Sequence, residues 1–297
     1  MKYRVVLWGL GIIYNRLLNT VRAYEDKGSI EVVGVTSKDI PPYKRIDGYR
    51  IITPKEVNLT SFDYIIIMNE GSFADIFSFI TVELGISDDR VLSYRMFQIP
   101  KLDITKYILL KQEKITILTN NCWGGMVYQF LGFECISPLR NCFMLDEDYL
   151  RFLSSPKEYL DDKPICCGFE KDVHTGHTYP VLEINGVRIH CNHETDANHA
   201  IDEWERRKRR VNMNNLFVEM YTENKEIESA FEKLIQYNKR VCFVPWETEC
   251  KHSLQLVLLP NQKDFYETVN LNGGNGGWRY DLVSLLLTGE IKSRVEE

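Results

Sequence analysis

A thiol and two amides directly follow a segment that has the composition of a β-strand. Residues 114–119 are mostly apolar or β-branched, and the sequence NNCWGG occupies positions 120–125. A cysteine between the end of a strand and the start of a helix lies near backbone N–H groups and the positive helix terminus, and both favour the nucleophilic thiolate. Cys122 is therefore a candidate catalytic nucleophile.

The rest of this loop has residue types that suit ligand binding. Its amides could hydrogen-bond a carbonyl or a sugar hydroxyl, and its glycines would let the backbone approach a ligand. The candidate ligand contacts are Asn120, Asn121, Trp123, Gly124 and Gly125. A buried structural thiol in a tight turn is the alternative, because the chain contains eight cysteines. The residue types leave catalysis, ligand binding and a purely structural role open.

Five of the six histidines lie within 26 residues, at His174, His177, His190, His193 and His199. Zinc motifs have firmer spacing than this cluster. If a strand follows a turn at Asn185-Gly186, His190 and His193 point to opposite faces and would not chelate together. We therefore predict no metal site. His193 is the first candidate for a general base or a ligand contact, with an ordinary polar surface as the alternative.

Residues 196–211, DANHAIDEWERRKRRV, predict a helix whose apolar stripe includes Trp204, with Thr195 as its N-cap. Acids precede bases by four residues three times along it, which favours a solvated, self-paired face. In the alternative interpretation Trp204 stacks on a sugar ring and Arg207 or Arg210 holds a phosphate or carboxylate. The residues expected to line one pocket are Asn121, Cys122, His193, Trp204 and Arg207.

Predicted strands and helices alternate over residues 1–100, a pattern typical of a doubly wound parallel sheet. Apolar side chains at helical spacing predict one of these helices over residues 12–26, with its end before Gly28. Gly9 and Gly11 are candidate cofactor-binding residues, because a tight turn beneath a helix N-terminus can bind the phosphate of a nucleotide or sugar nucleotide. Tyr14 occupies the third glycine position of the dinucleotide fingerprint, and the second strand ends at Thr36 without an acid. NAD(P) is therefore not expected as a tight cofactor, and any cofactor is unknown. A turn that serves only the fold is the alternative.

Composition places a domain boundary near Pro100. The first hundred residues contain no Cys or His and hold 12 basic and 12 acidic side chains, whereas the remainder carries the whole net charge of −6. We predict an α/β chain, with a small Rossmann-like parallel-sheet domain over residues 1–100. A second α/β domain with a mixed sheet is predicted over residues 101–297, where a glycine-rich loop at 272–277 precedes a helix over 281–287.

Charge and hydropathy exclude several classes. A net charge of −6 argues against a general nucleic-acid binder. No apolar run approaches the length of a membrane span, and no small-residue cleavage site follows the apolar N-terminal segment. We expect a cytoplasmic protein whose eight cysteines are reduced thiols.

The second domain resembles a family of unknown-function domains in bacterial proteins labelled exopolysaccharide biosynthesis proteins. The resemblance covers roughly residues 110–260. Its elements occur in order: NNCWGG after a strand, Ser137-Pro138 with Asn141, the segment FLSSPKEYL, Tyr179-Pro180-Val181, and His193 followed by Ala200, Trp204, Arg207, Arg210 and Asn215-Leu216-Phe217. The first domain resembles the small Rossmann-like domains of sugar-modifying enzymes, through WGLG and DGYRIITPKEV.

The resemblance implies a role near surface polysaccharide assembly. We therefore expect a sugar- or polysaccharide-modifying protein, a transferase that uses an activated precursor. A non-catalytic sugar-nucleotide-binding or regulatory module and a thiol-dependent hydrolase are the alternatives. The expected partner is a small-molecule sugar or sugar nucleotide, and the chain could form a homo-oligomer.

Overall fold

A computed structural model describes residues 2–173, 175–256 and 280–291. The chain divides into two compact units, and we describe each by itself. The first comprises residues 1–112 with 131–133, and the second comprises 113–130 with 134–297. Parallel sheets occur in both units, and antiparallel strands form separate sheets. The predicted α/β class is therefore confirmed. His174 and the glycine-rich run at 272–277 lie outside the described residues.

A four-stranded parallel sheet forms the centre of the first unit, in the order β2-β1-β5-β6. The strands are β1 (Tyr3–Trp8), β2 (Ile30–Thr36), β5 (Tyr64–Ile67) and β6 (Val91–Ser93). All four residues of β5 are buried, as expected for a central parallel strand that is covered on both faces. A short hairpin, β3 (Arg45–Ile46) with β4 (Tyr49–Arg50), turns at two residues with positive φ, Asp47 and Gly48.

Helix α1 (Ile12–Asp26) has the predicted bounds and buries one face. The helix that begins at Phe73 runs as α2 (Phe73–Ser78) into a π-helical turn, η2 (Phe79–Glu83). The other helical elements of this unit are η1 (Pro54–Leu59), η3 (Asp88–Arg90), η4 (Tyr94–Gln98) and α3 (Ile104–Gln112). The core joins Val6 and Trp8 of β1 to Ile65 and Ile67 of β5 and to Ile80 of η2.

The second unit contains a parallel sheet in the order β13-β12-β11-β7. Its strands are β7 (Thr116–Thr119), β11 (Leu216–Tyr221), β12 (Arg240–Val244) and β13 (Ser253–Gln255). The helices α4 (Trp123–Leu131), α8 (Lys225–Glu232) and α10 (Leu282–Thr288) belong to this part of the chain. Because the strands are parallel, the loops after β7, β11 and β12 all leave from one edge, where α/β sheets bind ligands.

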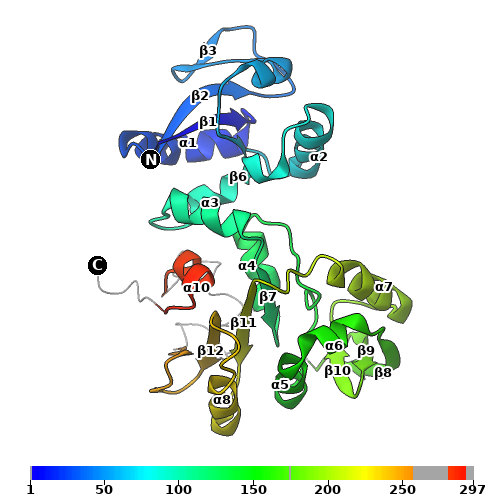
Figure 1. The fold of residues 1–297 in the computed structure, drawn as a ribbon. Coiled ribbons are helices and arrows are strands. Elements are labelled where there is room, and N and C mark those ends of the chain that lie inside the picture. The colour runs from blue at the N-terminus through cyan, green and yellow to red at the C-terminus, as the bar shows by residue number, and fades with distance from the viewer. Residues whose placement is uncertain (1, 174, 257–279, 292–297) are drawn as a thin grey trace. The chain divides into compact units, whose positions relative to one another are not determined.

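A separate antiparallel sheet, β10-β9-β8, completes the second unit. Its strands are β8 (Ile165–Lys171), β9 (Thr178–Ile184) and β10 (Val187–His190). The predicted turn at Asn185-Gly186 joins β9 to β10, with positive φ at both residues. Helix α5 (Asp146–Ser154) packs on β10, helix α7 (Ala197–Lys208) packs on β8 and β9, and α6 (Pro156–Asp161) follows α5 (Figure 1). One continuous apolar core links these helices to both sheets of the unit.

Candidate active site

Cys122 lies where strand β7 ends and helix α4 begins. The carbonyl of Cys122 accepts the backbone N–H of Met126 at 3.2 Å, so the cysteine occupies the capping position of the helix. The side-chain oxygen of Asn121 accepts the N–H of Trp123 at 2.7 Å, and the Thr119 hydroxyl donates to the Asn121 carbonyl at 2.6 Å. The thiol is half-buried. The strand-to-helix position predicted for this cysteine is therefore present.

The Cys122 thiol contacts the His193 imidazole. The distance from Sγ to Nε2 is 3.6 Å, within hydrogen-bonding range for sulfur. His193 lies in the loop after β10 and is exposed. A pair of backbone hydrogen bonds between Phe143 and His190, both 2.9 Å, holds the end of β10 in place three residues before His193. The structure thus brings together the two residues that the sequence offered as nucleophile and base.

The two amide side chains before Cys122, those of Asn120 and Asn121, are buried and hydrogen-bonded to other protein groups. The Asn120 side chain links the end of β7 to the end of β11. Its Nδ2 donates to the Tyr221 carbonyl at 2.9 Å, and its Oδ1 accepts the Tyr221 N–H at 3.1 Å. Nδ2 of Asn121 donates to Asn120 Oδ1 at 3.0 Å and to the carboxyl group of Glu219 at 3.0 and 3.2 Å. These bonds fix the loop backbone, so the two amides hold the loop in addition to any contact with a ligand.

Glu219 is fully buried in β11, and no basic side chain in the part of the chain that the structure describes forms an ion pair with it. Burial raises the pKa of this carboxyl group to about 8, although the hydrogen bond from Asn121 acts in the opposite direction. Glu219 was not among the site residues predicted from the sequence. A signal was present, because a single acid in the apolar run LFVEMY must lie inside a buried parallel strand.

A cavity of about 500 Å³ lies beside this loop. Asn121 and Asn192, the residues that directly precede Cys122 and His193, both line it. The other lining groups are carboxylates, aromatic rings, a lysine and further polar or apolar side chains: Asp146, Glu170, Asp172, Phe143, Tyr179, Tyr221, Lys171, Asn120, Met144 and Val173. Three carboxylates against one ammonium give the wall a formal charge of −2, so the cavity favours hydroxyl or amide groups over a diphosphate.

Asp146 lines this cavity and is hydrogen-bonded to the residues that follow β7 and β11. Its Oδ2 accepts the Thr222 hydroxyl at 2.5 Å, and its Oδ1 accepts the Asn120 amide at 3.2 Å. Burial raises the pKa of the Asp146 carboxyl group, although both hydrogen bonds lower it. Asp146 was not among the site residues predicted from the sequence, because an acid at the start of a helix is ordinary.

The aromatic candidates are core residues. Trp204 is 2% exposed and packs in the apolar core of the unit, and Trp123 is 1% exposed and lies against Phe217 and Phe243. Neither ring lines the described cavity. A sugar ring could therefore stack on either tryptophan only after the core had opened.

The basic candidates are held by protein groups. The buried Arg207 guanidinium donates to the Arg140 carbonyl and to Glu203, both at 2.6 Å, and Arg210 pairs with Glu134. Hydrogen bonds from Arg206 and the charge of Arg207 hold the pKa of Glu203 at about 2. Glu203–Arg207 is the one expected i,i+4 pair among these contacts, whereas the other partners, Arg140 and Glu134, lie outside α7.

The N-cap of α7 differs from the expectation. Asp196, and not Thr195, caps the helix, because its carboxylate accepts the His199 N–H at 2.7 Å. The aspartate can also interact favourably with the helix dipole.

The described histidines lie in different environments. His177 contacts the Glu194 carbonyl at 3.3 Å, and His199 pairs with the Glu194 side chain at 2.7 Å. His190 is buried between Phe143 and Tyr179, and this burial lowers its pKa even though Glu170 lies 3.2 Å from Nδ1. Within residues 2–173, 175–256 and 280–291, no group of three His, Cys, Asp or Glu side chains has the arrangement of a metal site.

The four candidate glycines have different surroundings. A Cβ atom on Gly9, whose φ is +121°, would lie 2.9 Å from the Met68 carbonyl oxygen, so the fold itself requires this glycine. A Cβ atom on Gly124 would lie 2.9 Å from Thr119 Cγ2, because α4 packs closely on β7. Gly11 has open space around it, and Gly125 has only an ordinary contact with Arg140. Close packing therefore explains two of the four without a ligand.

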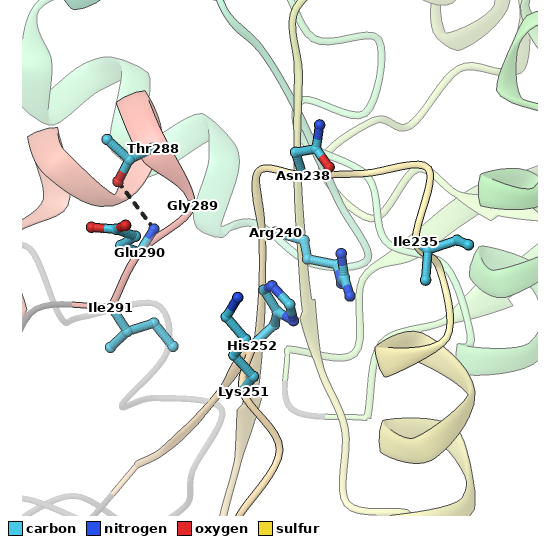
Figure 2. A pocket seen from close by; sticks show the side chains of 9 residues that line it. All are labelled: Ile235, Asn238, Arg240, Lys251, His252, Thr288, Gly289, Glu290 and Ile291. Atoms are coloured by element: carbon cyan, nitrogen blue, oxygen red, sulfur yellow. Dashed lines mark hydrogen bonds between the residues drawn. The ribbon is translucent and has the colours of Figure 1, made fainter.

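A second cavity, of about 700 Å³, lies at the opposite edge of the parallel sheet, between the start of β12 and the end of α10 (Figure 2). Its polar groups are largely bound to the protein. Arg240 donates to the carbonyls of Tyr237 and Glu232, and His252 pairs with the Glu232 carboxylate at 2.9 Å. These contacts leave no strong preference for a charged ligand, so we place the candidate chemistry at the Cys122 edge.

None of the helices in the described part of the chain is both long and apolar enough to cross a bilayer.

Comparison with known proteins identifies two families along the chain. Residues 1–92 match the family described as C2185-like, N-terminal. A protein of Haemophilus influenzae described as uncharacterised is 26% identical over 176 residues, which cover 58% of this chain and 82% of that protein. Residues 93–284, well over half of the chain, match the family described as Domain of unknown function (DUF1919). The chain, with its Cys122–His193 pair inside the matched segment, belongs to this family.

Proposed function

We propose that the second unit is a thiol-dependent transferase in which Cys122 is the nucleophile and His193 is the general base. The observation that carries the proposal is the 3.6 Å distance from Cys122 Sγ to His193 Nε2. A nucleophilic thiol needs a base within hydrogen-bond reach, or within one water, to remove its proton. The start of α4 adds a positive helix terminus that stabilises the thiolate.

Such a pair fits acyl transfer best. Nε2 of His193 takes the thiol proton, and Sγ attacks the carbonyl carbon of an activated acyl donor. The bond from that carbon to the leaving group breaks, the imidazolium returns its proton to the leaving group, and a thioester remains on Cys122. An acceptor hydroxyl then gives its proton to His193, its oxygen attacks the thioester carbon, and the Cys122 thiolate leaves.

The proposed acceptor is a hydroxyl-rich precursor of a glycan. The cavity lined by Asn121 and Asn192, the residues that directly precede Cys122 and His193, offers carboxylates, amides and aromatic rings, which suit sugar hydroxyls and the apolar faces of sugar rings. Its formal charge of −2 disfavours the diphosphate of a sugar nucleotide. We therefore favour a neutral sugar acceptor over the sugar-nucleotide-binding module.

A thiol-dependent hydrolase uses the same first step with water as the acceptor. The exposure of His193 favours this second candidate, since water can reach the imidazole. The two functions differ only in what resolves the thioester. Release of the acyl group to water, or its transfer to an added sugar, separates them.

The test uses p-nitrophenyl acetate as an activated acyl donor for the whole chain. We expect a burst of about one p-nitrophenolate per chain, because acylation of Cys122 releases it before the slower second step. The burst should be absent in Cys122→Ala and slow in His193→Gln. Cys167→Ser is the matched control, since Cys167 is an exposed thiol outside the site. A burst that survives in Cys122→Ala, or no burst in the wild type, would contradict the proposal.

A further inference from the structure

The Cys122 loop is tied to the centre of the sheet by one buried carboxyl group. Both oxygens of Glu219 lie within hydrogen-bond distance of Asn121 Nδ2, at 3.0 and 3.2 Å, although 98 positions separate the two residues. Asn121 is itself 4% exposed and directly precedes Cys122. Burial of a carboxyl group whose hydrogen-bond partner is an amide costs free energy of folding. A role for Glu219 at the Cys122 loop would explain why the chain keeps it.

Glu219 acts on the orientation of the Asn121 side-chain amide. An asparagine side chain can turn by 180° about its last bond and exchange its oxygen for its nitrogen. In the observed orientation Oδ1 accepts the Trp123 N–H at 2.7 Å, while Nδ2 donates to Glu219 and to Asn120. In the reversed orientation two N–H groups would face each other at the start of α4. The Trp123 N–H therefore selects the observed orientation, and Glu219 holds it by accepting a hydrogen bond from the Nδ2 group.

We propose that Glu219 is a positioning residue for the Cys122–His193 pair, which it aligns through Asn121 by fixing the start of helix α4. The proposal rests on the proposed function, in that it assumes Cys122 to be the reactive thiol. Glu219 is fully buried, so its effect on the thiol passes through Asn121.

The surroundings of Glu219 keep its carboxyl group protonated at neutral pH. The titratable groups that face it are Tyr149 of α5, Cys242 of β12 and Tyr280, none of which is a cation. Burial holds the pKa of Glu219 at about 8. A glutamine has the shape of the protonated acid and keeps one oxygen that can accept from Asn121, whereas an alanine removes the acceptor.

The experiment measures alkylation of Cys122 by iodoacetamide in the whole chain, followed residue by residue with peptide mass spectrometry. The exposed Cys167 in the same molecule is the internal reference. At pH 7 we expect the ratio of the Cys122 rate to the Cys167 rate to fall about tenfold in Glu219→Ala and in Asn121→Ala, the size of one unit of thiol pKa. Glu219→Gln should restore most of the wild-type ratio, a rescue that a merely space-filling role would not require.

Two results would overturn the proposal. The first is a ratio that stays at the wild-type value in folded Glu219→Ala and Asn121→Ala. The second is a Glu219→Gln protein that is folded by circular dichroism yet loses reactivity as fully as Asn121→Ala. If Glu219→Ala does not fold, Asn121→Ala and Glu219→Gln carry the same comparison. A wild-type Cys122 that reacts no faster than Cys167 would instead contradict the proposed function.

Discussion

Cys122 Sγ lies 3.6 Å from His193 Nε2, although 71 positions of sequence separate the two residues. The thiol is fixed where β7 ends and α4 begins, and the imidazole comes from the loop after β10. Strand pairing between Phe143 and His190 holds that loop beside the sheet edge.

The imidazole should raise the reactivity of the thiol. In His193→Gln we expect alkylation of Cys122 by iodoacetamide at pH 7 to slow about tenfold, because the base that favours the thiolate is lost. Peptide mass spectrometry gives the rates, with Cys167 as the internal reference. His199→Gln is the matched control, since His199 pairs with Glu194 and not with the thiol. Equal rates in His193→Gln and wild type would show that the contact has no chemical effect.

Gly124→Ala should destabilise the second unit, and Gly125→Ala should not. The new Cβ on Gly124 would lie 2.9 Å from Thr119 Cγ2 and 3.3 Å from Ile117 Cγ2, so α4 would have to move away from β7. Overpacking of this kind costs about 1–3 kcal/mol. At Gly125 the nearest atom is Arg140 Cγ at 3.7 Å, and alanine gains up to about 1 kcal/mol of helix propensity. Urea unfolding followed by tryptophan fluorescence measures both.

Trp204→Ala should reduce stability without removing a ligand contact. The indole is 2% exposed in the core, so its loss should cost about 3–5 kcal/mol in the free energy of unfolding. In Trp204→Phe, which keeps most of the packing, Cys122 alkylation and the p-nitrophenolate burst should match the wild type. A folded Trp204→Phe protein that loses the burst would show that the indole has a role beyond packing. Arg206→Ala, at an exposed position of the same helix, is the control for general effects on α7.

Glu219 should make stability fall as the pH rises. Its pKa is about 8 in the folded chain, above the ordinary value of 4.5 that it regains on unfolding. Between these values the folded state holds one more proton than the unfolded state, so its contribution is full below pH 4.5 and is lost on the way to about pH 8. The slope from this group approaches about −1.4 kcal/mol per pH unit.

Glu219→Gln should remove that slope. Urea unfolding at intervals from pH 5 to 8 compares the variant with the wild type, and the difference between the two free energies isolates this group. A wild type whose difference from the variant does not change with pH would show that Glu219 is ionised in the folded chain. Glu203→Gln is the opposite control, because the pKa of Glu203 is lowered from 4.5 to about 2, so its contribution is full above pH 4.5 and is lost as the pH falls toward about 2.

Local patterns in the sequence determined the elements that hold the site. The apolar stripe and its end at Gly28 predicted α1 over residues 12–26, and Asn185-Gly186 predicted the hairpin of β9 and β10, because turn chemistry and side-chain period act over a few residues. The strand–NNCWGG–helix order likewise placed Cys122 at a sheet edge. These features depend on neighbours in the sequence, and the sequence by itself was enough.

Tertiary structure alone decided which side chains face the site. Trp204 and Arg207 carry the residue types of a sugar and phosphate site, yet the helix turns both toward protein groups, since burial of its apolar stripe outweighs their exposure. The approach of Cys122 to His193, and that of Asn121 to Glu219, depends on how the antiparallel sheet and β11 pack around β7. Such contacts between residues far apart in the chain follow from the packing of whole elements, which no local pattern in one sequence encodes.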